Sequence, residues 1–391
     1  TISNSGTASN NTSAFVGRYS GSSGTVTVDG ISSNWINNGT LDVGYEGTGV
    51  LTIRNGGTVS NTTGYIGTEA SSSGTVTVDG SGSSWISSFA LSIGHYGTGT
   101  LTISNGGTVN NNISTLIGRY PGSSGAVTVD GSGSSWVNNG ILYVGDEGTG
   151  ELTIRNGGTV SNNTSATIGR YAGGLGTVIV DGSDSSWISN GTLTIGNEGT
   201  GVLTIRNSGL VNATGGVAVG VNTTGSANLS LTSGGTLQTQ ALTAGSGTVT
   251  VTFDNGILRA LADNASFITG FAPGELFIDA GGLTVDDNGY AIATDSSIFS
   301  GMGGLTKTGS GTLTLGGVNT YSGATTITSG TLKAGIAGAF SAASAYTVGS
   351  NATLDLDSHD QRIASLVNSG TVRISSAASA NPVGATLTVN G

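Results

Sequence analysis

Residues 51–61 read LTIRNGGTVSN, and close variants of this segment recur along the chain at intervals of 50 or 51 residues. The opening LTI returns at Leu101, Leu152 and Leu203. Between these copies lies a related motif, VTVDG or VIVDG, which begins at Val26, Val76, Val127 and Val178. The repeating unit is therefore built from two related halves, one long and one short.

A third marker, an apolar residue followed by glycine, sets the length of each half. It falls at Gly17, Gly44, Gly67, Gly94, Gly118, Gly145, Gly169, Gly196 and Gly220, with gaps of 23, 24 or 27 residues. Each half holds three short segments with the alternation of a strand, separated by glycine-rich turns. We therefore predict an all-β fold, a parallel β-helix with three strands per coil of 23–27 residues, because stacked coils close one another's strand edges. A β-propeller blade, at roughly 40–50 residues, is too long for this half-repeat.

Composition narrows the classes of partner. The net charge is −11 with only two lysines, which argues against nucleic acid and anionic membrane surfaces as partners. The sequence has no cysteine and no apolar run of membrane-spanning length, so we expect no membrane insertion by this segment. Met302 is the only methionine, so we expect a mature product or a fragment; because the sequence ends without a polar cap, we also expect more protein after Gly391.

The regularity of the repeat divides the chain into three parts. We predict a regular β-helix of double-coil repeats over 1–260, an irregular or distorted segment over 261–303, and a C-terminal β-helix over 304–391.

If equivalent strands stack, inward and outward columns can be predicted. Val26 and Leu51 begin one inward column, Val28 and Ile53 begin the next, and Thr27 points outward between them because strand neighbours alternate sides. One step on, an outward column alternates acid and base with one exception, Ser104: it reads Asp29, Arg54, Asp79, Ser104, Asp130, Arg155, Asp181 and Arg206. Each Asp is predicted to pair with an Arg above or below, which would fix the register of the coils.

The stretch GLTKTGSGTL at 304–313, with NTYSG at 319–323 and GTL at 330–332, resembles the passenger-associated transport repeat of monomeric (type V) autotransporters of Gram-negative bacteria. The repeats of residues 1–211 are similar to those of large adhesin-type passengers. The resemblance implies a passenger domain folded as a right-handed β-helix and exported to the cell surface through the outer membrane. It also implies a C-terminal β-barrel translocator as partner, which is not in this chain.

No group of residues in the sequence predicts a catalytic, metal or cofactor site. His95 occupies a variable turn position, and His359 lies among Asp355, Asp357 and Asp360, where a solvated turn is favoured over a weak metal site. We expect no catalytic site, no metal and no cofactor.

Two surfaces are candidates for binding a partner. The first is a strip of the four tryptophans, Trp35, Trp85, Trp136 and Trp187, which are 50, 51 and 51 residues apart. Aligned with Thr58, Thr108, Thr159 and Leu210 of the short halves, they would project outward on alternate coils, with Ile36 facing inward beside Val59. The alternative is that each tryptophan is covered by its own loop or turned into the core.

The second candidate is the pair of residues that follows each marker glycine. The pairs are Arg18-Tyr19, Tyr45-Glu46, Thr68-Glu69, His95-Tyr96, Arg119-Tyr120, Asp146-Glu147, Arg170-Tyr171 and Asn197-Glu198, and the second member is always Tyr or Glu. Such an edge suits polar self-association between antiparallel copies, because many weak contacts add along a rod. The alternative is a solvated edge that keeps open turns soluble.

Together these patterns predict a cell-surface adhesin that promotes bacterial self-association, aggregation and biofilm formation. The alternatives are an adhesin that binds a host receptor or glycan through the tryptophan strip, and a passive structural stalk.

Overall fold

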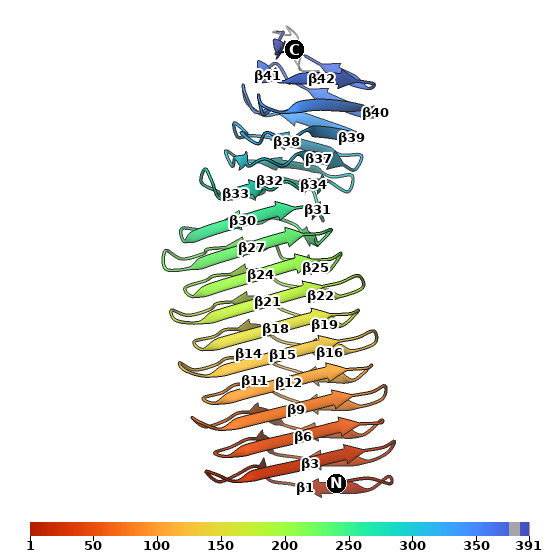
Figure 1. Ribbon diagram of the computed structural model, residues 1–391, viewed down its shortest axis with the longest axis vertical. Coiled ribbons are helices and arrows are strands. Elements are labelled where there is room, and N and C mark those ends of the chain that lie inside the picture. Colours follow the sequence, from red (N-terminus) through yellow and green to blue (C-terminus); the bar gives the residue numbers. More distant parts are fainter. Residues whose placement is uncertain (375–383, 391) are drawn as a thin grey trace.

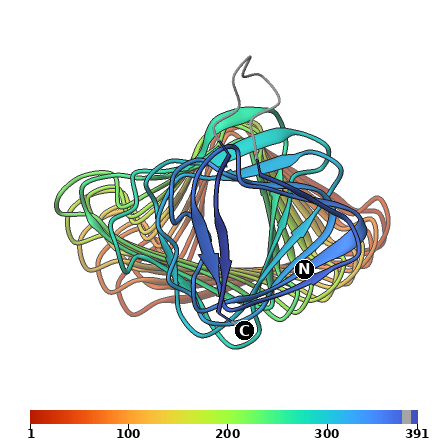
Figure 2. The ribbon, with the colours of Figure 1, turned by 90° about the horizontal axis from the view of Figure 1, so that it is seen from above.

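A computed structural model describes residues 1–374 and 384–390, and every regular element in those ranges is a strand. The strands stack coil upon coil into one rod with the two termini at opposite ends (Figure 1). Seen along the rod, the coils superpose and their strands outline three sides (Figure 2). The predicted all-β solenoid with three strands per coil is confirmed. The same residues contain no helix long and apolar enough to cross a membrane.

Each coil adds one strand to each of three parallel stacks. The first sheet consists of β3 (Ser23–Asp29), β6 (Thr48–Arg54), β9 (Ser73–Asp79), β12 (Thr98–Ser104), β15 (Ser124–Asp130), β18 (Thr149–Arg155), β21 (Leu175–Asp181), β24 (Thr200–Arg206), β27 (Ser226–Thr232), β30 (Thr248–Asp254), β33 (Leu276–Ile278) and β36 (Phe299–Ser300). The second stack consists of β1 (Thr7–Asn10), β4 (Asn34–Asn37), β7 (Thr58–Asn61), β10 (Ser84–Ser87), β13 (Thr108–Asn111), β16 (Ser135–Asn138), β19 (Thr159–Asn162), β22 (Ser186–Ser189), β25 (Leu210–Ala213), β28 (Thr236–Thr239), β31 (Gly256–Ala260), β34 (Leu283–Asp286) and β37 (Leu305–Thr308). The third stack consists of β2 (Ala14–Val16), β5 (Thr40–Val43), β8 (Thr63–Ile66), β11 (Leu91–Ile93), β14 (Thr115–Ile117), β17 (Leu142–Val144), β20 (Ala166–Ile168), β23 (Leu193–Ile195), β26 (Val217–Val219), β29 (Leu242–Ala244), β32 (Asn264–Thr269), β35 (Ala291–Thr294) and β38 (Thr312–Leu315).

The second and third stacks join into one sheet near the C-terminal end. There the long strands β39 (Thr325–Ala334) and β40 (Ala345–Asp355) each span both stacks, and β42 (Ser365–Asn368) and β43 (Thr371–Arg373) pair with β40. β41 (Gln361–Ile363) pairs with β44 (Leu387–Val389). The ladder continues through the predicted irregular segment 261–303, where β32 and β35 show a register shift. The predicted part boundaries stay a prediction, and residues 375–383 and 391 of the last part lie outside the described residues.

The core is made of the predicted inward columns. Val26 stacks on Leu51 and Val28 on Ile53, and the same register runs up the first sheet. Val28 and Ile53 are fully buried, whereas Thr27, which lies between Val26 and Val28 on the same strand, is partly exposed. Alternation with a period of two therefore places one continuous apolar column inside the rod, which is how a chain poor in charge and without disulfides stabilises itself.

The marker glycine is required by the turn that follows each third strand. Gly67 has φ 69°, and a Cβ built on it would lie 2.2 Å from the carbonyl oxygen of Thr98 in the next coil. Both the backbone conformation and the close approach of the next coil exclude a side chain. This explains why glycine recurs at this position in the coils from Gly17 to Gly220.

A buried ion pair stabilises the coil at 287–311. Lys307 and Asp287 are both fully buried and form a salt bridge. The Lys307 ammonium also donates to the carbonyl oxygens of Gly309, at 2.8 Å, and Ser329, at 2.9 Å. Burial lowers the pKa of Lys307, and Asp287 opposes that shift.

Candidate functional site

The residues that follow the marker glycines form one continuous edge between the third stack and the first sheet, here called the Tyr/Glu edge. It comprises Arg18-Tyr19, Tyr45-Glu46, Thr68-Glu69, His95-Tyr96, Arg119-Tyr120, Asp146-Glu147, Arg170-Tyr171 and Asn197-Glu198. Backbone hydrogen bonds join successive turns, such as Thr68 N to Gly44 O at 2.8 Å and Glu69 N to Tyr45 O at 2.8 Å. Equivalent side chains are therefore about 4.8 Å apart along the rod.

Several side chains on this edge are free to meet a partner. Tyr19 is 65% exposed, Tyr96 43% and Tyr171 38%. Among the described residues, none of the four edge glutamates forms an ion pair; they are Glu46, Glu69, Glu147 and Glu198.

Aromatic residues of the third stack extend the edge and were not predicted from the sequence. Phe15 packs edge-on against Tyr45, with ring centroids 5.1 Å apart, and Tyr65 packs against His95 at 4.8 Å. Tyr96 and Tyr120, on successive coils, stack face to face at 4.2 Å. The signal in the sequence is an aromatic residue two positions before some marker glycines, but other coils carry Asp, Ser, Thr, Leu or Ala there.

The arginines of the edge lie over these rings. The Arg170 guanidinium is 4.0 Å from the Tyr143 ring centre and 4.4 Å from that of Tyr171, and it forms a 3.0 Å ion pair with Asp146. Arg18 lies over Phe15 at 4.8 Å and Arg119 over Tyr120 at 4.9 Å. Rings and cations thus hold one another in place, so the edge is preorganised for contact.

The largest pKa shifts at and beside the edge are those of His95, on the edge, and of Asp42, beside it in the third stack. Burial, with a smaller contribution from the Arg119 cation, lowers the pKa of His95 to about 4. Burial raises the pKa of Asp42, on β5, to about 6, against a hydrogen bond from the Thr68 hydroxyl and with the Glu69 carboxylate adding to the rise. At neutral pH the His95 side chain is therefore uncharged, so it does not form an ion pair with a glutamate of the edge.

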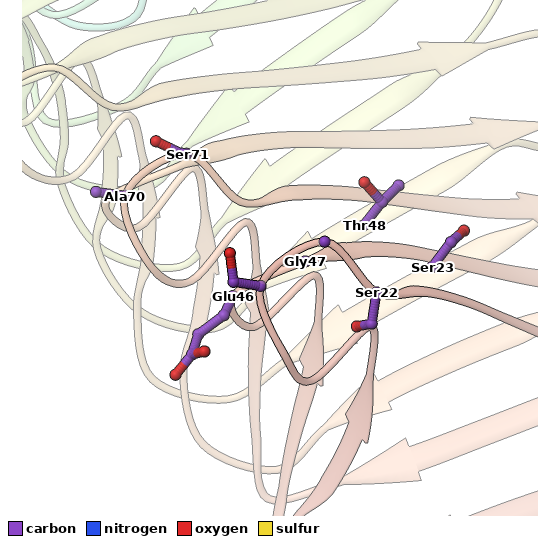
Figure 3. A pocket seen from close by; sticks show the side chains of 9 residues that line it. Ser22, Ser23, Glu46, Gly47, Thr48, Ala70 and Ser71 are labelled. Atoms are coloured by element: carbon purple, nitrogen blue, oxygen red, sulfur yellow. The ribbon is translucent and has the colours of Figure 1, made fainter.

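A pocket of about 480 Å³ opens on the edge, where turns of unequal length alternate. Its lining comes from three successive turns, and Figure 3 shows Glu46 on the middle turn, with Ser22 on one neighbouring turn and Ser71 on the other. The lining is small and hydroxylic. It offers hydrogen bonds from hydroxyls beside a free carboxylate, with the exposed ring of Tyr19 next to Ser20.

The predicted charge column of the first sheet is present. Arg54 lies 2.9 Å from Asp29, Arg155 2.9 Å from Asp130, and Arg206 2.9 Å from Asp181. Each arginine pairs only with the aspartate of the preceding coil, and Asp79 accepts a hydrogen bond from the Ser104 hydroxyl at 2.7 Å instead.

Sequence reasoning missed a second partner of each aspartate. The asparagine after the Arg or Ser donates to the other carboxylate oxygen, as from Asn156 to Asp130 at 2.7 Å. The equivalent donors, all with positive φ, are Asn55, Asn105 and Asn207. The pKa of Asp29 is lowered by Asn55 and by Arg54. The charge column thus joins neighbouring coils of the first sheet, and none of its residues belongs to the Tyr/Glu edge.

The outward tryptophan strip is wrong, and the alternative, tryptophans turned into the core, is confirmed for Trp85, Trp136 and Trp187. Trp85, Trp136 and Trp187 are fully buried, and Trp35 in the first described coils is partly buried against the core. Trp85 stacks on Val59 rather than beside Thr58, so the assumed register was off by one residue and every side chain changed sides. Ile36, expected to face inward, pairs with Ser60 and is 40% exposed.

Each indole has a polar partner that the sequence analysis did not identify. Trp136 Nε1 donates to the Asn111 side-chain oxygen at 3.0 Å and Trp187 Nε1 to that of Asn162 at 2.9 Å. Both asparagines are fully buried. The regular interval therefore places the tryptophans in the core, where a buried asparagine accepts the hydrogen bond of the indole N–H.

The acidic turn around His359 is occupied by ion pairs. Arg373 lies 3.2 Å from Asp355, and Lys333 lies 2.8 Å from Asp357. Over residues 1–374 and 384–390, no three His, Asp or Glu side chains are grouped to hold a metal.

Comparison with known proteins adds to this geometry. Residues 305–334 match the passenger-associated-transport-repeat family. The adhesin BmaC autotransporter of Brucella suis biovar 1 (strain 1330) is 32% identical over 293 residues, 66% of this chain and 8% of that protein. The uncharacterized lipoprotein YdeK of Escherichia coli (strain K12) is 37% identical over 105 residues, 26% of this chain and 8% of that protein. The chain thus spans a small part of the length of both relatives.

Proposed function

Since this chain is part of the passenger domain of an adhesin-type autotransporter, exported through the outer membrane to the bacterial cell surface, we propose that it joins cells by self-association. In this proposal the Tyr/Glu edges of two copies on neighbouring cells meet in antiparallel orientation and promote aggregation and biofilm formation. The role is one of binding, without catalysis. A C-terminal translocator is the partner that such a passenger requires for export.

The observation that carries the proposal is the order of charges along the edge. Counting the eight turns from Arg18 to Glu198, a two-fold axis between the fourth and fifth turns places Arg18 of one copy opposite Glu198 of the other. The same axis places Glu46 opposite Arg170 and brings the stacked rings of Tyr96 and Tyr120 to the centre. A two-fold contact makes each of these pairs twice.

One pair opposes the contact, because Glu69 and Glu147 meet each other under this axis. Each exposed ion pair contributes under about 1 kcal/mol, so affinity arises from repetition along the rod and between many copies on two cells. Such contacts are reversible one by one and weaken as salt rises.

Charge reversal tests the proposal in the full-length autotransporter, displayed on bacteria that do not otherwise aggregate. Arg18→Glu should slow settling, and adding Glu198→Arg should restore it, because the double variant re-forms the pair with reversed polarity. Arg362→Glu is the matched control, since Arg362 is exposed on β41, away from the edge. Equal settling by all four proteins, or no settling by the parent, would rule out self-association through this edge.

The second candidate is binding to a host receptor or glycan. Burial of the tryptophans removes the strip first considered for it, but the exposed Tyr19 beside the hydroxyl-lined pocket offers a ring on which a sugar can stack. Adherence to host cells without settling, lost in Tyr19→Ala, would favour this candidate. If the bacteria neither settle nor adhere to host cells, a passive stalk is favoured.

A further inference from the structure

A second exposed ladder runs along another corner of the rod, where each strand of the second stack turns into the third. The residue that follows the strand is asparagine in six coils, here called the asparagine corner: Asn11, Asn38, Asn112, Asn139, Asn163 and Asn190. All six side chains are exposed. The Tyr/Glu edge lies at a different corner, so the two surfaces are separate.

The side-chain amides of this corner are hydrogen-bonded from coil to coil. Asn139 donates to Asn112 at 3.0 Å, Asn163 to Asn139 at 2.6 Å, and Asn190 to Asn163 at 3.3 Å. Asn38 donates in the same way to Asn11 at 2.8 Å. A ladder of this kind requires only asparagine at each position.

Five of the six asparagines carry an additional feature that the ladder does not explain. A hydroxyl residue stands two positions later, as in Asn11-Thr12-Ser13, Asn38-Gly39-Thr40, Asn112-Ile113-Ser114, Asn163-Thr164-Ser165 and Asn190-Gly191-Thr192. Asn139 is followed by Gly140 and Ile141, yet it occupies the ladder with two hydrogen bonds. In the described structure the side-chain hydroxyls of four of the five make no hydrogen bond, and Thr192 donates to Gly215 O at 3.3 Å. The hydrogen bonds of the fold therefore do not account for four of these five hydroxyls.

From this pattern we propose that Asn11, Asn38, Asn112, Asn163 and Asn190 are acceptors for N-linked glycosylation, since Asn-x-Ser/Thr in an exposed turn is the acceptor sequence. The donor is a nucleotide-activated sugar. The Asn Nδ2 forms a bond to the anomeric carbon, the bond from that carbon to the diphosphate breaks, and the nucleoside diphosphate leaves with the electron pair. Nδ2 gives up one proton to the transferase.

The ladder tolerates this modification. An asparagine amide has two N–H donors, and each corner amide gives at most one to its neighbour in the ladder. The sugar replaces the other hydrogen, so the coil-to-coil bond remains.

Mass spectrometry of the passenger, released from the surface of the bacterium that produces it, tests the proposal directly. With fragmentation that keeps the glycosidic bond, we expect a sugar on Asn112 and none on Asn139. Ser114→Ala should remove the sugar from Asn112, and Ile141→Thr, which completes the pattern at Asn139, should add one there. Circular dichroism checks that both variants fold.

Bare asparagine at all five positions would overturn the proposal. So would a sugar found only on serine or threonine, or a sugar on Asn112 that survives Ser114→Ala. None of these readouts depends on cell settling, so glycosylation and self-association are tested separately.

Discussion

Arg155 forms its 2.9 Å ion pair with Asp130 on the preceding coil, although Asp181 on the following coil is equally in register with it. Asp181 is instead bound by Arg206, at 2.9 Å. The charge column is thus a series of separate pairs, each within one repeat. A slip by one coil would place carboxylate against carboxylate, so the pairs favour the observed register.

Replacing one member of the column should therefore reveal its contribution. Arg155→Asp removes a pair and places a carboxylate between Asp130 and Asp181, so it should lower the melting temperature. Ser104→Asp also creates three neighbouring carboxylates but loses only a hydrogen bond to Asp79, so its effect should be smaller. The excess for Arg155 should be under about 1 kcal/mol and should shrink in high salt. Equal losses for the two variants would contradict a role for the pair.

Tryptophan fluorescence should report a buried core rather than a binding strip. With Trp85, Trp136 and Trp187 fully buried, emission should be blue-shifted and acrylamide should quench little of it. Trp136→Ala should destabilise the rod by about 3–5 kcal/mol, because it empties a large core site. Trp35→Ala should cost less, since Trp35 is only partly buried. Emission typical of solvated indole would contradict the structure.

The inward columns were predictable because a strand alternates strictly, so Val28 and Ile53 had to share one side of the first sheet. The tryptophans were not predictable in the same way. The turns before β10 and β7 differ in length, 80–83 against 55–57, and nothing in the sequence says which residue of the longer turn is extra. An error of one residue there inverts the strand. The contacts of Asn55 with Asp29, and of Tyr65 with His95, depend on turn geometry that periodicity does not specify.

The stability of the fold should depend on pH through the protonation of Asp42. Its pKa is 3.8 in the unfolded chain and about 6 in the fold, so the folded state binds the proton more tightly and gains stability as pH falls from 7 toward 4. A difference of that size corresponds to about 3 kcal/mol. Asp42→Asn keeps an oxygen for the Thr68 hydroxyl and removes the charge. It should melt higher than the parent at pH 7.5, and the gain should vanish below about pH 4.

Asp29→Asn is the matched control with the opposite sign. Asn55, then Arg54, lower the pKa of Asp29, so its charge stabilises the fold above pH 3.8 and this stabilisation is lost as pH falls through the lowered value. The variant should melt below the parent at pH 7.5. If Asp42→Asn and Asp29→Asn shift the melting temperature in the same direction at that pH, the assignment for Asp42 is wrong.

Variants of the buried pair Lys307 and Asp287 should show whether stability depends on pairing the two charges or on the hydrogen bonds that the Lys307 ammonium makes. Lys307→Ala leaves the Asp287 carboxylate buried without a counter-charge, which should cost about 3–5 kcal/mol and expose the C-terminal coils to proteolysis. Lys307→Met with Asp287→Asn removes both charges, and the new amide oxygen can still accept from the Gly289 and Gly311 N–H groups, which now bind Asp287 at 2.9 Å. This double variant should recover most of the lost stability, because the penalty lies in the unpaired charge. Protection from proteolysis no better than in Lys307→Ala would instead assign the loss to the three carbonyl groups that the ammonium binds.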